Sequence, residues 1–211
     1  MKFSMTLSAG LALAGLTTAA PLTTREAKTA AQIIAEIAPT SLTCADTAEC
    51  RTNVQAAPFL IKAMSQYGLG SPGQIAAVLA LTAFESQDYK YKHNIDPGRP
   101  GQGTSNMQQI NFNAEYASSF PELKGKVAAI GAATSTDAQN KILALVTEDQ
   151  YNFGSGPWYL KNKCTPDVVS GLEKATDDAF AAYIQQCVGV PGPVAPARLA
   201  YWARAKTAFG L

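Results

Sequence analysis

The stretch "SPGQIAAVLALTAFESQ", residues 71–87, decides the fold expected for this chain. Pro72 stands near its start, and proline is favoured at the first position of a helix. From Ile75 to Phe84 nearly every residue is apolar, so a helix formed here is apolar on all sides and must be buried. The sequence therefore predicts a mainly α fold built around this helix, which ends at Glu85.

Glu85 at the end of this apolar helix has two interpretations. On a helix it lies on the same face as Leu81 and Val78, four and seven residues earlier. Burial beside such side chains disfavours the charged carboxylate and raises its pKa, as a general acid requires. The alternative is a solvated acid at a helix end, and the position alone leaves both open.

A long loop is expected after this helix. The helical period disappears between Asp88 and Asn113, and "DPGRPGQGTSN" (96–106) is rich in glycine and proline. Loops of this length in compact domains are commonly functional, and a small hairpin is the one strand feature expected here. Further helices are expected at 25–38, 53–67, 113–133, from 136, at 158–163, between the last two cysteines, and at 197–209.

Residues 1–20 have the pattern of a secretory signal peptide, with Lys2 before an apolar stretch and small residues at its end. The stretch is too short to span a bilayer. We expect residues 21–211 to form a single domain, with 21–43 as a loosely attached N-terminal segment. The predicted protein is secreted and extracellular, monomeric, and without a membrane partner.

The four cysteines, Cys44, Cys50, Cys164 and Cys187, predict two disulfides because an exported chain folds in an oxidising compartment. Their spacings lack the paired C-x2-C motifs of structural zinc, so no metal is expected. Of three connectivities, the sequence-local one is favoured, Cys44 with Cys50 and Cys164 with Cys187.

The second pair requires a fold-back. A continuous helix from Cys164 to Cys187 would be about 33 Å long, whereas a disulfide needs Cα atoms within about 7 Å. We expect the chain to turn at Gly171 or at Thr176.

Charge argues against nucleic acid as a partner. The formal net charge is +1, and it falls to about zero without Lys2. Acids and bases alternate along the chain, so a polyanion would not be held by bulk electrostatics. No cofactor is implied.

Three short motifs together resemble a known superfamily. "ES" (85–86), "GTSNMQQI" (103–110) and "YNFGSG" (151–156) follow the motif order of soluble lytic transglycosylases and goose-type lysozymes. The longer stretch 83–108, with "FGSGPWYL" (153–160), resembles fungal secreted lysozyme-like proteins of muramidase type. The resemblance implies a lysozyme-like fold in which a buried central helix carries the catalytic Glu and the long loop lines the cleft.

The resemblance also implies residue roles. Glu85 would be the catalytic acid, and Ser86, Met107, Gln108, Tyr151 and Asn152 would bind substrate, with Tyr89 added as a ring that could stack on a sugar. Relatives carry an aspartate where this chain has Asn152, which puts the hydrolytic rate in doubt. A second carboxylate, if one is used, would be Asp96 or Asp88, about 5 Å from Glu85 in a retaining mechanism or about 6.5 to 9.5 Å in an inverting one. The alternative for both residues is an ordinary loop acid.

The expected activity is that of a glycoside hydrolase. Its polysaccharide substrate would be bacterial peptidoglycan, cut at the β-1,4 bond between N-acetylmuramic acid and N-acetylglucosamine. The alternatives are a chitin-directed glycosidase or a lytic transglycosylase on the same fold, and a non-catalytic glycan-binding protein.

Overall fold

The computed structural model describes residues 27–211, so the expected signal peptide lies outside the described residues. The described part is mainly α-helical, as predicted, and its strand pairing is limited to two isolated bridges, His93 to Gly103 and Gly103 to Gln108. The α-helices are α1 (Ala30–Ile37), α2 (Asn53–Gln66), α3 (Pro72–Glu85), α4 (Ile110–Ser118), α5 (Pro121–Ile130), α6 (Thr136–Val146), α7 (Asp149–Asn152), α8 (Ser155–Lys163), α9 (Pro166–Gly171), α10 (Asp177–Ala182) and α11 (Pro196–Phe209). Three short helical turns complete the list: η1 (Pro39–Leu42), η2 (Leu172–Lys174) and the π-helical η3 (Tyr183–Cys187).

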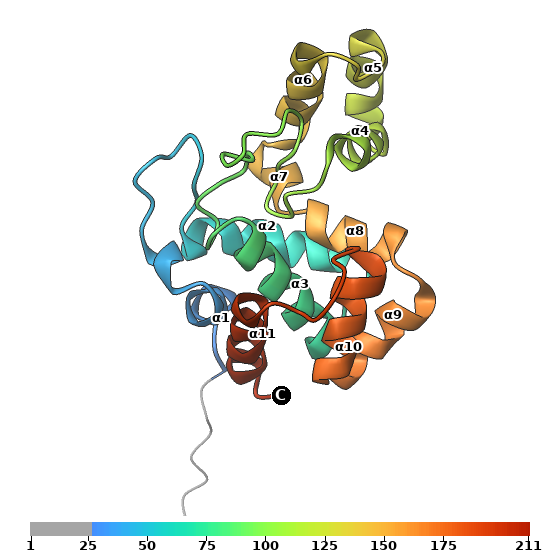
Figure 1. Cartoon of the computed structure of the whole chain (residues 1–211). Helices are drawn as coiled ribbons and strands as arrows, with labels where there is room; N and C mark the ends of the chain where they lie inside the picture. Colours follow the sequence, from blue (N-terminus) through green and yellow to red (C-terminus); the bar gives the residue numbers. More distant parts are fainter. Residues whose placement is uncertain (1–26) are drawn as a thin grey trace, which may run out of the picture.

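Helix α3 is the buried centre of the larger part of the molecule. All residues from Ala76 to Ala83 are buried, as expected of a helix that is apolar on every face. Helix α11 packs along α3 (Figure 1), where the rings of Phe84 and Tyr201 meet edge to face at 5.7 Å. The C-terminal helix is therefore held directly against the helix that carries Glu85.

Helix α1 also belongs to this packing. It contacts α2 and α11, and its Ile34 and Ile37 are buried. A capping box fixes its start, since Thr29 and Gln32 hydrogen-bond to each other's backbone N–H groups. From Ala30 onward, the segment expected to be loosely attached is packed on the core.

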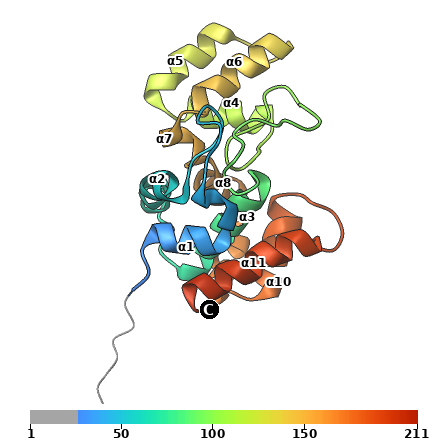
Figure 2. The ribbon, with the colours of Figure 1, turned by 90° about the vertical axis from the view of Figure 1, so that its left-hand side faces the viewer.

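The molecule has two parts, which we call the body (α1–α3 and α8–α11) and the lobe (α4–α7). In Figures 1 and 2 the lobe stands beyond α2 and α8, with the loop 88–109 running along its base. The lobe has its own apolar cluster, in which Tyr116 packs against Phe120 and against Trp158 of α8. The two parts therefore meet through aromatic side chains.

The helix expected over 113–133 is two helices. Helix α4 ends at Ser118, and α5 starts at Pro121, because proline lacks the N–H that a continuing helix needs. Helix α6 begins at Thr136, and Ser135 caps it by accepting a hydrogen bond from the Ala138 N–H. The start of this helix therefore agrees with the helix expected from residue 136.

Both disulfides have the sequence-local pairing. Cys44 is bonded to Cys50, with Cα atoms 5.6 Å apart, and Cys164 to Cys187, with Cα atoms 5.0 Å apart. The second bond is reached because the chain turns between α9 and α10. Thr176 caps α10, so the predicted fold-back is confirmed.

Within residues 27–211, no helix is both long enough and apolar enough to cross a bilayer.

Candidate active site

Glu85 lies at the end of α3, where the backbone turns sharply away. Gln87, Asp88 and Tyr89 all have positive φ angles, of 51°, 62° and 62°. The fully buried Ser86 stabilises this turn: its hydroxyl donates to the Thr82 carbonyl at 2.6 Å and accepts from the Tyr89 N–H at 2.9 Å. Ser86 therefore stabilises the backbone turn next to Glu85 and is inaccessible to a ligand, whereas the resemblance implied that Ser86 binds substrate.

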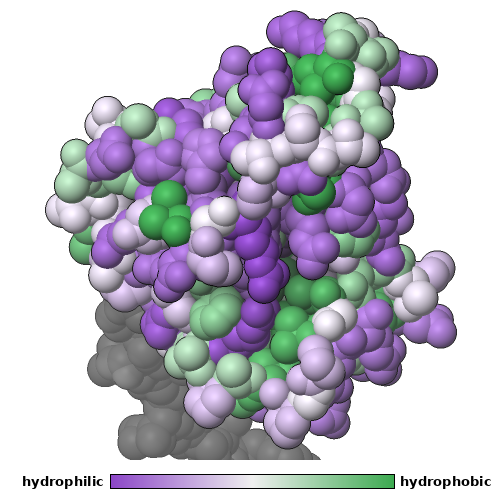
Figure 3. Space-filling view, turned by 45° about the horizontal axis from the view of Figure 1, so that its top comes forward, coloured by the Kyte–Doolittle hydropathy of each residue, from purple (hydrophilic) through white to green (hydrophobic). Residues whose placement is uncertain are grey.

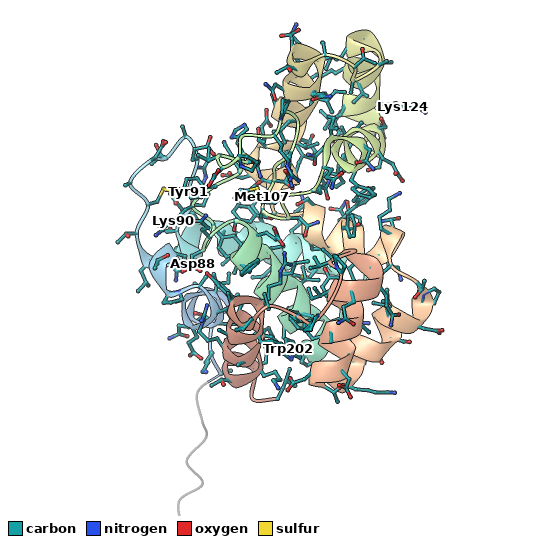
Figure 4. The ribbon with its side chains drawn as sticks, viewed as in Figure 1. Asp88, Lys90, Tyr91, Met107, Lys124 and Trp202 are labelled. Atoms are coloured by element: carbon teal, nitrogen blue, oxygen red, sulfur yellow. A yellow bond between two sulfur atoms is a disulfide. The ribbon has the colours of Figure 1, made fainter. Side chains whose placement is uncertain are left out.

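The Glu85 side chain opens into a cleft between the body and the lobe. Two adjoining hollows, of about 340 and 300 Å³, share Glu85, Gln102 and Met107. Met107 is labelled in Figure 4 where the loop at the base of the lobe approaches the body. Figure 3 shows hydrophobic residues gathered along a furrow on this face, with hydrophilic residues on both sides. The Glu85 carboxyl is thus reachable by a ligand from two directions.

The first hollow has a mixed lining. Apolar contacts come from Phe112 of α4, Tyr159 of α8 and Val190 of the linker before α11, among others. Polar groups also line it: Glu85, Arg99, Gln102, Asn106, Gln108, Gln109 and Arg198. An amphiphilic ligand fits such a cleft better than a wholly polar or wholly apolar one.

Glu85 is paired with Arg198 of α11. The Nη2 atom of Arg198 lies 2.7 Å from Oε1 of Glu85, and the two side chains are 14% and 20% exposed. Burial raises the pKa of the Glu85 carboxyl above its ordinary value, although the guanidinium of Arg198 acts in the opposite direction. The carboxyl is therefore easier to protonate than an exposed glutamate.

Several buried polar atoms around the hollow have no hydrogen-bond partner in the described protein. They are Oε1 of Gln102, Oδ1 of Asn106, Nε2 of Gln108 and Nη1 of Arg198. The first two accept hydrogen bonds and the last two donate them. Buried polar atoms are normally paired, so these four atoms indicate the position of a polar ligand or of ordered water.

The structure brings some predicted residues to the cleft. Met107 and Gln108 line the hollow that contains Glu85, and Met107 adopts a positive φ of 45°. The bridge from Gly103 to Gln108 shapes this part of the loop. Asp96 is exposed and lines the second hollow together with Glu85.

Asp88 lies elsewhere, with its carboxylate satisfied inside the protein. Oδ2 accepts from the Thr40 N–H and hydroxyl at 2.9 and 2.7 Å, and Oδ1 accepts from the Tyr201 hydroxyl at 2.6 Å. Burial and this carboxylate raise the pKa of Tyr201 to about 12. Asp88 therefore joins η1 to α11 and lines neither hollow.

Tyr89, Tyr151 and Asn152 also lie outside the two hollows. The Tyr89 side chain is 3% exposed and packs edge to face against Phe153 in the core. Tyr151 is buried in the lobe cluster and donates to the Glu122 carboxylate at 3.0 Å. Asn152 is 5% exposed in α7. The resemblance assigned Tyr151 and Asn152 to the cleft and Tyr89 was expected there as a stacking ring, whereas packing directs their side chains into the interior.

Arg198 is a site residue that the sequence analysis did not single out. It is separated from Glu85 by more than a hundred positions and lies in the C-terminal helix α11. Its one sequence signal is the glycine- and proline-rich linker 188–196, which returns α11 to the cleft.

The metal-binding potential of the described residues is small. They contain no group of three or more His, Cys, Asp and Glu side chains arranged to hold a metal ion. Each of the four cysteines is in a disulfide, and Nδ1 of His93 lies 2.7 Å from Oε1 of Glu49.

Comparison with known proteins gives one curated relative. The chain is 50% identical over 159 residues to a bifunctional dioxygenase–epoxy alcohol synthase of Fusarium oxysporum (strain Fo5176). The match covers 74% of this chain but 12% of that protein, so the chain spans about one eighth of its relative's length. No family model matches the chain, and no solved structure matches it.

This relative overturns the resemblance to lysozyme-like proteins. Identity of 50% over 159 residues outweighs a resemblance carried by three short motifs and the stretch 83–108. The expected glycoside hydrolase activity is therefore wrong, together with its muramidase, chitinase, transglycosylase and glycan-binding variants. The polysaccharide partner, peptidoglycan or chitin, is withdrawn for the same reason.

Proposed function

We propose that this chain is an acid–base domain that opens the epoxide ring of an epoxy alcohol, with Glu85 as the proton donor. The observation that carries the proposal is the half-buried Glu85 carboxyl, with its raised pKa, at the floor of an amphiphilic cleft. We take the epoxy alcohol as substrate class from the name of the Fusarium relative. Because the match covers 12% of that protein, we do not extend the relative's other activities to this chain.

The cleft walls suit such a ligand. Phe112, Tyr159 and Val190 would contact its hydrocarbon part. A hydroxyl both donates and accepts, so it could pair with the unpaired Nε2 of Gln108 and Oδ1 of Asn106. These hydrogen bonds would satisfy two buried side-chain atoms that have no partner within the described protein.

Ring opening requires Glu85 to donate one proton and then to recover one. The Glu85 carboxyl donates its proton to the epoxide oxygen while one ring C–O bond breaks. A water oxygen forms a new bond to that carbon and gives up a proton to the Glu85 carboxylate. The net change is addition of one water to the epoxy alcohol, which yields a triol and leaves Glu85 protonated again.

We also propose a lysozyme-like arrangement for the fold, secretion, and a single domain. The arrangement of the fold is supported by a glutamate at the end of a buried helix and a long loop beside it. Secretion and a single domain over 21–211 are supported by the apolar N-terminal pattern and the two disulfides.

A second candidate function is binding of the same ligand without chemistry. The observation that favours it is the ion pair with Arg198, because the guanidinium stabilises the ionised form of Glu85, which cannot donate a proton.

The test is incubation of wild type with epoxyoctanol in ¹⁸O-labelled water, with the triol measured by mass spectrometry. We expect labelled triol from wild type and an at least hundredfold lower rate from Glu85→Gln, in line with loss of a general acid. Glu36→Gln is the matched control, since Glu36 lies on α1 and pairs with Lys28 away from the cleft.

The outcomes separate the two candidates. Equal triol formation by wild type and Glu85→Gln would rule out Glu85 as the donor. Saturable binding of epoxyoctanol by wild type with no triol above the buffer rate would replace catalysis by binding.

A further inference from the structure

We infer that the cleft contains an anion subsite beside Glu85, formed by Arg198 and Arg99, that takes a carboxylate group of the ligand. The inference rests on the proposed function in placing the ligand in this cleft, and it adds the chemical class of the ligand: a molecule with a carboxylate next to the oxygen that receives the proton.

Arg198 supplies the first part of the subsite. Its Nη2 is engaged by Glu85 at 2.7 Å, while its Nη1 is buried without a partner. The guanidinium lies 4.5 Å from the centroid of the Phe84 ring, which fixes its plane. A held guanidinium with a free donor is suited to a carboxylate oxygen, since arginine forms its strongest hydrogen bonds with such anions.

The surroundings favour a negative group over a neutral one. Arg99 lines the same hollow from the loop at the base of the lobe, so two guanidinium groups face one carboxylate, Glu85. Beside the first hollow, the other titratable groups are Tyr159, which lines it, and the buried Tyr183, whose hydroxyl has no partner. Burial raises the pKa of both tyrosines, so both are neutral near pH 7. The adjoining hollow, which also contains Glu85, adds Asp96, His93 and Tyr91. Among the charged groups that line the first hollow, the two arginines outnumber the one carboxylate.

Glu85 and the bound carboxylate would share Arg198. A second anion beside the guanidinium reduces its hold on the Glu85 carboxylate and adds like-charge repulsion, and both effects favour protonated Glu85. Binding and proton uptake are then linked, so each promotes the other by the same factor. The ion pair with Arg198 favours the ionised form of Glu85 in the free protein, and a bound carboxylate would shift Glu85 toward its protonated, proton-donating form.

The probes are octanoate and octanol, which share a chain and differ in the charged group. We expect wild type to bind octanoate at least tenfold more tightly than octanol, by calorimetry near pH 6. Repetition in buffers of different ionisation enthalpy should show proton uptake with octanoate and none with octanol. A ¹³C NMR titration of the Glu85 carboxyl should show its pKa rising when octanoate is bound.

Variants test the residues. Arg198→Gln should remove the preference for octanoate, Arg198→Lys should restore part of it, and Arg99→Gln should reduce it several-fold. The control is Lys174→Gln, because Lys174 is exposed on η2 and lines neither hollow.

Three results would overturn the inference. They are equal affinity of wild type for octanoate and octanol, an unchanged octanoate preference in folded Arg198→Gln, and octanoate binding without proton uptake. None of these measurements involves an epoxide, so the subsite can stand if ring opening fails and can fail while ring opening stands.

Discussion

The body and the lobe of this molecule are packed in different ways. Around α3 the core combines small and aliphatic side chains, such as Ala76, Val78 and Leu81 at no more than 2% exposed, with buried aromatic rings such as Phe180 and Trp202. The lobe relies on edge contacts between aromatic rings, and among the residues of α5 Leu123 is the buried one. A close-packed interior resists displacement, so the body fixes Glu85, while the lobe is the part whose position can set the width of the cleft.

Truncation of one leucine in each part gives the largest expected contrast. Leu81→Ala should lower the free energy of unfolding by about 4 kcal/mol, because α3 is enclosed and the cavity cannot collapse. Leu123→Ala should cost about 2 kcal/mol, since the exposed faces of α5 allow the lobe to close around the gap. Urea unfolding measures both.

Hydrogen exchange adds the local readout. Leu123→Ala should increase exchange in α4 to α6 and leave α3 protected, whereas Leu81→Ala should lower protection everywhere. An equal loss of protection in α3 for both variants would show that the lobe and the body unfold as one unit.

Removal of each disulfide should have a middle-sized effect. Cys164–Cys187 closes a loop of 23 residues in the body, and its replacement by two alanines should cost about 3 kcal/mol. Cys44–Cys50 closes six residues in the segment whose Arg51 pairs with Asp149 of the lobe, and its replacement should cost about 2 kcal/mol. Denaturant midpoints of the two double variants give the comparison, and a reversed order would mean that contact with the lobe outweighs loop length.

The smallest expected effect is the pH dependence that Glu85 gives to stability. The pKa of Glu85 is raised in the folded protein, so the folded protein binds this proton more tightly than the unfolded chain does. The resulting stabilisation is complete below the ordinary glutamate pKa and is lost as pH rises through the folded value. Wild type should therefore lose stability relative to Glu85→Gln as pH rises from about 4 to about 8.

A rise in the relative stability of wild type over this pH range would contradict this expectation. It would mean that the Arg198 pair, rather than burial, dominates the electrostatics of Glu85. The measurement is urea unfolding of both proteins in the same series of buffers.

Local patterns in the sequence predicted much of the helical framework. Residues 75–84 gave a buried helix because apolar residues on every face leave no side for water, and Pro72 marked its start. The fold-back before Cys187 followed from the length of a helix against the reach of a disulfide, and Thr176 was one of two sites proposed for it. These predictions needed no knowledge of distant contacts.

The site was predicted less well, for two different reasons. Tyr151 and Asn152 belong to a motif and Tyr89 was chosen for its ring, but the three side chains are buried, and a linear motif carries no information on side-chain direction. Arg198 was missed because its partner is more than a hundred residues away. The activity first expected was wrong because it rested on a resemblance of motifs, which the longer match to the Fusarium relative outweighs.

The sequence by itself determined the buried central helix, the placement of Glu85 at its end and the need for a fold-back if Cys164 pairs with Cys187, because these depend on periodicity and chain reach. Tertiary structure alone decided that the Asp88 carboxylate accepts hydrogen bonds from Thr40 and Tyr201, and that Arg198 pairs with Glu85. It also placed side-chain amides with unpaired atoms around the Glu85–Arg198 pair. These features arise where segments far apart in the chain meet. Hydrogen bonding and charge there depend on distances in space, which a linear pattern does not contain.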